Sequence, residues 1–305
     1  MKNRENKKKK GSWMFYFLLG VLLFLIYLVG CRADFLAEQF AFHPPKFPRG
    51  DWGSWDKTDN VSKEVSFRNT KNQLLVGRYF ECQKVQKLIS DSLADSNHPN
   101  NATQGSILYC HGNAENISHL VDFALQLSGD LRCNVLIFDY AGYGKSEGNP
   151  TAKGILDDGR AARDWLAAHD GISREQVIVY GQSLGGSVAV DIAAGDGAMG
   201  LIVESSFTSL GDMGRKIFPF LPANYLLRER LASVEKIGNV TCPVFISHGK
   251  PDNVVPFSQG QRLFDNAKEP KTFYITPSGY DYHSAPHCET HRKKLKEFIK
   301  SLQKK

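Results

Sequence analysis

Short apolar runs alternate with longer amphipathic segments along most of the chain. The apolar runs lie at residues 107–109, 135–138, 177–180, 201–203, 244–246 and 272–275. Segments with helical periodicity separate most of them, as at 155–168 and 187–194. Upstream, residues 64–69 and 74–80 have the composition of two hairpin strands. Strands that are apolar throughout and alternate with amphipathic helices predict an α/β fold, with a mostly parallel sheet of about eight strands and helices on both faces.

Two stretches depart from this alternation. Residues 84–104 are polar, with Asn, Ser, Asp and His clustered, which predicts a variable surface excursion. Residues 32–60 carry several Pro, Gly and aromatic residues without periodicity. We expect this second stretch to be a linker that packs against the domain or against a membrane surface.

The amino-terminal apolar segment, residues 13–31, has no charge from Trp13 to Gly30 and follows the basic run Lys7–Lys10. Its length is at the lower limit for crossing a bilayer. Two interpretations stay open: a transmembrane anchor, or a lipoprotein signal in which Leu28-Val29-Gly30-Cys31 acts as a lipobox and Cys31 becomes lipidated. Because the basic run orients the amino terminus toward the cytoplasm, both predict that the folded domain is tethered on the non-cytoplasmic side.

Composition limits the remaining possibilities. The chain has 305 residues, of which 42% are hydrophobic and 23% charged, so it can build a buried core. The net charge of +6 is concentrated at 7–10 and 292–305, without interleaved aromatic residues, and predicts no nucleic-acid partner. Six cysteines without CxxC spacing give no support for a zinc site. The predicted organisation is a basic region at 1–12, an anchor or signal at 13–31, a linker at 32–60 and a folded domain at 61–305.

The strongest chemical motif is Gly181-Gln182-Ser183-Leu184-Gly185-Gly186, which lies between a predicted strand and a predicted helix. A Gly-x-Ser-x-Gly run in this setting is typical of a nucleophile elbow, whereas the same run elsewhere is often an incidental turn. The glycines relieve crowding around a strained serine, and the following helix amino terminus favours developing negative charge. We therefore predict Ser183 as the nucleophile of a serine hydrolase.

Acyl transfer also needs two donors for the oxyanion. The candidates are the backbone amides of Leu184, directly after the nucleophile, and of Asn113, in a loop that follows the first buried strand. His111 lies in that loop but precedes Ser183, whereas the usual chain order in this type of sheet is serine, acid, histidine. We expect His111 to support the loop rather than to act as the base.

The acid and the base must follow the serine. Asp252 comes after the strand at 244–246 and is predicted to be the acid, although a turn aspartate after proline is common. The loop after the last strand holds His283 and His287. His283 lies closer to the strand end and is the preferred base, with His287 as the alternative and His291, in the predicted final helix, as a third candidate.

These motifs together resemble the α/β-hydrolase superfamily, and most of all a branch of membrane-anchored abhydrolases of bacteria and eukaryotes, some of whose eukaryotic members are protein depalmitoylases. The runs that carry the resemblance are His111-Gly-Asn-Ala-Glu-Asn116, Phe138-Asp-Tyr-Ala-Gly-Tyr-Gly-Lys-Ser-Glu-Gly148, Gly181-Gln-Ser-Leu-Gly-Gly186, Glu204-Ser-Ser-Phe-Thr-Ser209 and His248-Gly-Lys-Pro-Asp252. The resemblance extends from residue 64 to nearly the end. It implies an α/β-hydrolase fold and a Ser183, Asp252 and His283 triad, with the Asn113 and Leu184 amides as the oxyanion hole.

Two positions depart from the family pattern. Ala141 stands where many relatives carry an arginine, which removes an ion-pair option but no catalytic group. The family histidine usually belongs to a Gly-x-His run, whereas three residues separate Gly279 from His283 here. The histidine loop is therefore longer than in relatives.

The predicted activity is hydrolysis of a carboxylic ester or thioester through an acyl-enzyme, without a metal or an organic cofactor. Residues 212–236 are expected to form a small cap, or only the packed helix common to such domains. Their apolar content and the amino-terminal apolar segment favour a small or lipid-like acyl substrate. A serine peptidase or amidase, and a non-catalytic membrane-anchored binding module with the same fold, are the alternatives. No oligomeric state is predicted.

Overall fold

The computed structural model describes residues 16–21, 42–53, 55, 58–93, 103–217, 231–277 and 289–303. Residues 16–21 are helical and exposed. Within the described ranges, no helix is both long and apolar enough to cross a membrane. Most of the amino-terminal apolar segment, the middle of the predicted cap, and both His283 and His287 lie outside these residues.

Eight strands form one sheet in the order β1-β2-β4-β3-β5-β6-β7-β8. They are β1 (Ser62–Arg68), β2 (Leu74–Phe80), β3 (Ser106–Cys110), β4 (Asn134–Phe138), β5 (Val177–Gln182), β6 (Gly200–Glu204), β7 (Val244–Gly249) and β8 (Lys271–Thr276). β1 and β2 pair antiparallel with each other, and β2 is antiparallel to β4. All pairs from β4 to β8 are parallel. The predicted sheet is confirmed, including its antiparallel hairpin.

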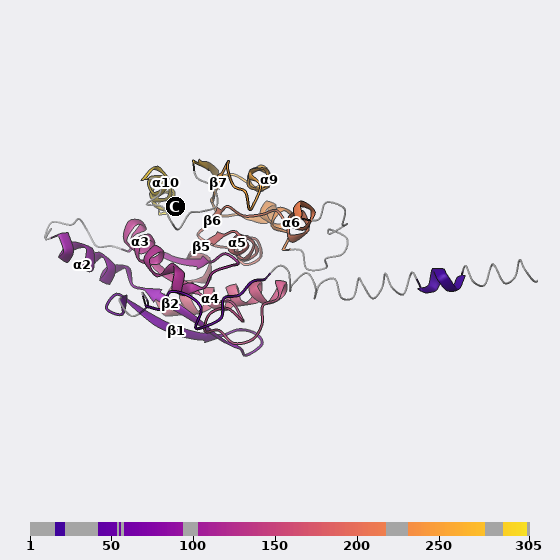
Figure 1. Cartoon of the computed structure of the whole chain (residues 1–305). Coiled ribbons are helices and arrows are strands. Elements are labelled where there is room, and N and C mark those ends of the chain that lie inside the picture. Colours follow the sequence, from indigo (N-terminus) through magenta and orange to yellow (C-terminus); the bar gives the residue numbers. More distant parts are fainter. Residues whose placement is uncertain are drawn as a thin grey trace, which may run out of the picture.

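Helices cover both faces of this sheet (Figure 1). Those described are α2 (Cys82–Leu93), α3 (Val121–Leu131), α4 (Ala152–Asp170), α5 (Leu184–Gly195), α6 (Leu210–Ile217), α8 (Ser233–Lys236), α9 (Phe257–Asn266) and α10 (Glu289–Leu302), with short 3-10 turns η2 (Ile117–Leu120), η3 (Arg174–Gln176) and η4 (Ile237–Asn239). One buried cluster joins the sheet to α4 and α5, and a second joins it to α3 and α10.

The two clusters explain why the central strands are apolar throughout. Successive side chains of a strand point to opposite faces. In β3, Leu108 belongs to the cluster under α4 and α5, whereas Ile107 and Tyr109 belong to the cluster under α3 and α10. A strand with helices on both sides therefore has no polar face.

Helix α2 is not among the helices that the sequence predicts. It occupies residues 84–93 of the stretch predicted to be a variable surface excursion. Cys82 and Val85 are fully buried on one face of the helix. Gln86 donates to the carbonyl of Gly129 in α3 at 2.7 Å. The few apolar residues have helical spacing, and packing against α3 outweighs the polar composition around them.

Candidate active site

Ser183 is the single residue between β5 and α5, and its backbone is left-handed, with φ of 51° and ψ of −115°. This conformation is unfavourable for a residue with a side chain, so the surrounding structure must hold it in place. Its amide donates to the carbonyl of Glu204 at 2.9 Å, and the Ser206 hydroxyl donates to the carbonyl of Ser183 at 2.7 Å. The end of β6 therefore fixes the turn, and Ser183 is 7% exposed.

The three glycines around Ser183 are places of close approach. A Cβ on Gly181 would lie 2.7 Å from the Cα of Gly186, and one on Gly185 would lie 2.7 Å from the carbonyl oxygen of His111. A Cβ on Gly186 would clash with the side chain of Ser206. These contacts give a physical reason for the motif, because the elbow fits between the end of β3 and the end of β6 only without side chains at these positions.

The loop that carries Asn113 lies beside this elbow. β3 pairs in parallel with β5, and Cys110 at the end of β3 is opposite Gly181. The Leu184 amide is the first of α5 and has no acceptor within its own helix. The amide of Asn113 belongs to the neighbouring strand end. The structure thus brings both predicted oxyanion residues to the edge of the sheet where the parallel strands end, which we call the carboxyl edge.

The side chain of Asn113 is held from two directions. Its Oδ1 accepts a hydrogen bond from the Tyr143 hydroxyl at 2.7 Å and another from the backbone amide of His43 at 3.0 Å. Burial raises the pKa of Tyr143 above its usual range, so the hydroxyl keeps the proton that it donates. Neither Tyr143 nor His43 was predicted as a site residue.

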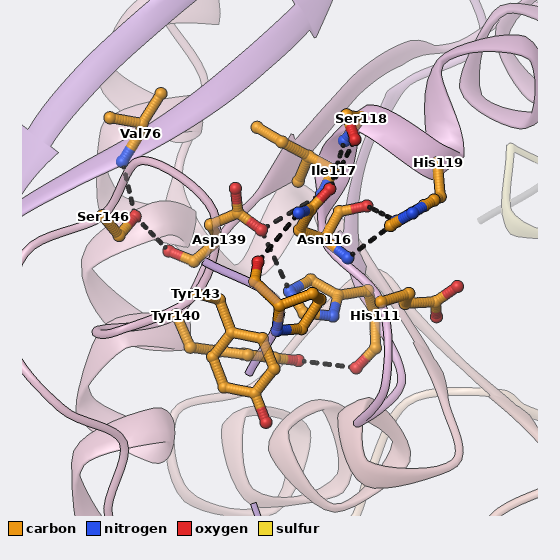
Figure 2. Close-up of polar contacts among 12 residues, drawn as sticks. Val76, His111, Asn116, Ile117, Ser118, His119, Asp139, Tyr140, Tyr143 and Ser146 are labelled. Atoms are coloured by element: carbon orange, nitrogen blue, oxygen red, sulfur yellow. Dashed lines mark hydrogen bonds and ion pairs between the residues drawn. The ribbon is translucent and has the colours of Figure 1, made fainter. Parts of the chain in front are cut away.

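His111 is the first residue of the oxyanion loop after β3 and is fully buried. Its Nδ1 is 2.6 Å from the carbonyl oxygen of Gly112 and donates to it, because a carbonyl can only accept. The hydroxyl of Tyr140 donates to the carbonyl of His111 at 3.1 Å (Figure 2). A ring enclosed in this way supports the loop, which agrees with the role expected from the sequence.

Asp139 is the buried partner of this histidine. Its Oδ1 is 3.6 Å from Nε2 of His111 and accepts from the amide of Ile117 at 3.0 Å (Figure 2). Burial raises the pKa of Asp139 to about 8, so the carboxyl is largely protonated at neutral pH. Sequence reasoning assigned no role to Asp139, although it stands in one of the runs that carry the family resemblance.

Asp252 follows β7 at the same carboxyl edge, and its side chain is buried. Its Oδ1 accepts from the backbone amides of Val254 and Val255, both at 2.8 Å. Its Oδ2 lies 3.3 Å from Nε2 of His248 but makes no hydrogen bond to any described residue, because that nitrogen bonds to the carbonyl of Val255. One oxygen therefore holds the loop, and the other is open to a further donor.

Ser183 and Asp252 follow strands that are separated by one strand, β6. Two strand spacings amount to about 10 Å, so a third group must connect the two side chains. β8 lies next to β7, and the predicted base His283 and its alternative His287 follow β8. Both histidines lie outside the described residues, so their assignment stays a prediction.

His291, the third candidate, does not belong to this site. It lies in α10, is 2% exposed, and packs against Tyr274 and against Phe245 near the amino-terminal end of β7. Burial lowers its pKa to about 3, which makes the ring a poor proton acceptor at neutral pH.

Comparison with known proteins agrees with this architecture. The model of the family described as "Alpha/beta hydrolase family" matches residues 107–286. The uncharacterised protein Rv2307c of Mycobacterium tuberculosis is 36% identical over 180 residues, which cover 59% of this chain and 64% of that protein. The alpha/beta hydrolase domain-containing protein 17B of Homo sapiens is 36% identical over 180 residues, covering 58% and 60%. The matched part thus spans less than two thirds of these curated relatives.

Among solved structures, the esterase Pf2001 of Pyrococcus furiosus superposes with a TM-score of 0.63, covering 85% of this chain and 99% of that one. At 20% sequence identity, this similarity concerns the fold alone. The family match and the eight-stranded, mostly parallel sheet flanked by helices lead to one conclusion. This chain belongs to the alpha/beta hydrolase family.

Proposed function

We propose that this protein is a serine hydrolase that cleaves carboxylic esters or thioesters through an acyl-enzyme formed on Ser183. The observation that carries the proposal is the conformation of Ser183, a left-handed residue between β5 and α5 at the carboxyl edge of the sheet. A strained serine in this place presents its hydroxyl to substrate rather than to the core. Family membership, and an esterase among the proteins of similar fold, support hydrolysis as the reaction class.

In the proposed reaction, His283 removes the proton of the Ser183 hydroxyl while Oγ attacks the substrate carbonyl carbon. The resulting oxyanion accepts hydrogen bonds from the amides of Asn113 and Leu184. As the tetrahedral intermediate collapses, His283 returns the proton to the leaving alcohol or thiol. A water molecule, activated by the same histidine, then releases the carboxylic acid and restores the serine.

Asp252 is proposed to hold the tautomer and orientation of the base. The amides of Val254 and Val255 fix its Oδ1, so the carboxylate cannot rotate freely. The buried Oδ2 is left to accept the second ring N–H of the base and to stabilise the imidazolium. This arrangement favours a catalytic role over that of a simple turn aspartate, in which both oxygens would serve the backbone or face water.

We propose an apolar acyl chain as the preferred substrate group. Val254, two residues from Asp252, is 48% exposed and offers apolar surface beside the site. The predicted cap at 212–236 is rich in Phe, Leu and Pro at 217–222. Burying a hydrocarbon chain against such surface contributes about 25 cal/mol of favourable free energy for each Å² of apolar area removed from water.

We also propose that the amino-terminal apolar segment tethers the catalytic domain to a membrane, with the domain on the non-cytoplasmic side. The support is the uncharged run that follows Lys7–Lys10. Mass spectrometry of the mature amino terminus distinguishes the two forms of tether. A lipidated Cys31 identifies a lipoprotein, an uncleaved amino-terminal segment in protein from the membrane fraction identifies a transmembrane anchor, and recovery of the protein outside the membrane fraction contradicts the proposal.

Activity is tested with matched acyl esters, thioesters and amides of increasing chain length, using wild type and Ser183→Ala. The proposal predicts turnover of esters or thioesters by wild type and its loss in S183A. Turnover of amides alone would identify a peptidase or amidase. Equal turnover by both proteins would contradict Ser183 as nucleophile, and no turnover by wild type would favour a binding module.

A further inference from the structure

Residues 42–53, here called the strap, precede the first strand in sequence but pack directly on the loops at the carboxyl edge of the sheet. Phe42 is buried in the core under α4 and α5. The amide of Phe47 donates to the carbonyl of Gly144 at 2.9 Å, and the amide of Gly144 donates to the carbonyl of Pro45 at 3.1 Å. The strap is therefore bonded to the loop that follows β4.

A second set of bonds joins the strap to the segment that follows the oxyanion loop. The side-chain amide of Asn116 donates to the carbonyls of Pro45 and Arg49, both at 2.8 Å. Oδ1 of the same side chain accepts from the amide and the hydroxyl of Ser118 at the start of η2 (Figure 2). Asn116 thus acts as a clamp, with its donor side on the strap and its acceptor side on the catalytic domain.

The third contact reaches the oxyanion residue itself. Oδ1 of Asn113 accepts from the backbone amide of His43 in the strap and from the hydroxyl of Tyr143 in the loop after β4. The strap supplies one of these two donors. A segment that precedes the first strand in sequence therefore helps to hold the side chain of Asn113.

We propose that the strap is a positioning element of the active site, which fixes the oxyanion amide of Asn113 by bonding to its side chain and to Asn116. The inference rests on the proposed function. Donors of an oxyanion hole act only when they are aligned in advance, and an error of about 1 Å in a positioned group costs on the order of a hundredfold in rate. Since residues 32–41 alone separate the strap from the amino-terminal apolar segment, the proposed tether leads directly into the oxyanion loop.

Asn116→Asp tests the clamp in the full-length protein. Aspartate keeps the oxygen that caps η2 but replaces the donor to two strap carbonyls by an acceptor, so the strap is released while the cap remains. Asn149→Asp is the matched control, because it makes the same change of charge at a residue whose Oδ1 accepts from Lys46 of the strap and still does so as a carboxylate. We expect kcat on a short p-nitrophenyl ester to fall about tenfold in N116D with KM within twofold, and to stay at the wild-type value in N149D.

A second pair of variants isolates the bond to Asn113. His43→Pro removes the donating amide and His43→Ala keeps it, while both lose the ring. Proline is compatible with this position because His43 already precedes Pro44, which restricts it to extended backbone. We expect kcat of H43P to fall about tenfold below that of H43A, with equal KM and with thermal unfolding temperatures within a few degrees.

The kcat and the unfolding temperature of these variants distinguish a positioning role of the strap from a purely stabilising one. Loss of contacts to a strap that only stabilised the fold would lower the unfolding temperature and leave kcat unchanged. Wild-type kcat in both N116D and H43P would overturn the strap proposal while leaving the proposed function intact. A wild-type protein that hydrolyses none of the esters or thioesters would overturn both.

Discussion

Replacing Asp252 by asparagine separates the two tasks of this carboxylate. The asparagine carbonyl can still accept from the amides of Val254 and Val255, which are 2.8 Å from Oδ1 in the native protein. Its NH₂ group then occupies the place of the buried Oδ2, where the proposed base needs an acceptor. Two donors would face each other, so the imidazole of His283 would turn to the tautomer that offers its N–H to Ser183 and cannot accept a proton.

The magnitude follows from these contacts. An imidazole in the wrong tautomer lowers kcat of a Ser-His-Asp hydrolase by about 10⁴, equivalent to roughly 5 kcal/mol in the activation barrier. Since D252N keeps both backbone bonds, its folding free energy should stay within about 1 kcal/mol of wild type. Asp252→Ala gives up both bonds at about 1 kcal/mol each, and should unfold roughly 4–8 °C lower as well as losing activity.

The assay is steady-state ester hydrolysis, with thermal unfolding followed by circular dichroism on the same samples. Glu204→Gln is the control, because Glu204 is a buried carboxyl at the end of the adjacent strand β6 and accepts from the hydroxyl of Tyr180. A D252N variant that keeps more than a tenth of wild-type kcat would show that Asp252 is not the acid of the triad. If E204Q then loses activity, the acid belongs to β6.

Three further changes address other parts of the account. His283→Ala should lower ester turnover by about 10³ or more while His287→Ala keeps it, and the reverse pattern would assign the base to His287. Gly185→Ala should lower the free energy of unfolding in urea by about 1–3 kcal/mol and abolish turnover, because the added Cβ collides with backbone carbonyls at the end of β3. Gly195→Ala is the control in the same helix. Its Cβ makes only an ordinary contact, so stability and turnover should stay at the wild-type level. Asp139, with a pKa of about 8 in the folded state, keeps a proton there that the unfolded chain releases near pH 4. The free energy of unfolding of wild type should therefore fall by up to about 1.4 kcal/mol per pH unit from pH 4 to 8, and Asp139→Asn should remove this slope. Urea unfolding at pH 5, 7 and 9 measures it. The same pH dependence in wild type and D139N would contradict the prediction.

Most of the sheet was predictable because each buried strand is an unbroken apolar run with helical segments on either side. The buried strands β3 to β7 satisfy this rule, and their order in the sheet follows the usual connections of parallel strands. β8 lies at the edge of the sheet and is partly exposed. Helix α2 was not predictable by the same means. Its apolar face consists of a few residues such as Cys82, Val85 and Ile89 among polar neighbours. This pattern is too short to predict a helix by itself, and packing against α3 stabilises it.

In the candidate site, too, the residues in local motifs were predictable and the distant residues that support them were not. Ser183 and Asp252 were identified because each stands in a short motif directly after an apolar strand, where local sequence determines position. The groups that support them were missed: the Tyr143 hydroxyl reaches Asn113 across 30 positions of the chain, and the backbone amide and ring of His43 in the strap reach it across 70. No local pattern encodes such contacts, because they join residues that are far apart in the sequence.

The proposed activity depends on Ser183 as the nucleophile, and covalent labelling shows whether this serine is reactive. Wild-type protein and Ser183→Ala are treated with a fluorophosphonate, digested and examined by mass spectrometry. We expect one phosphonylated peptide in wild type, modified at Ser183, and no labelling in S183A. An unlabelled wild-type protein, or a modification that persists at another residue in S183A, would contradict this expectation.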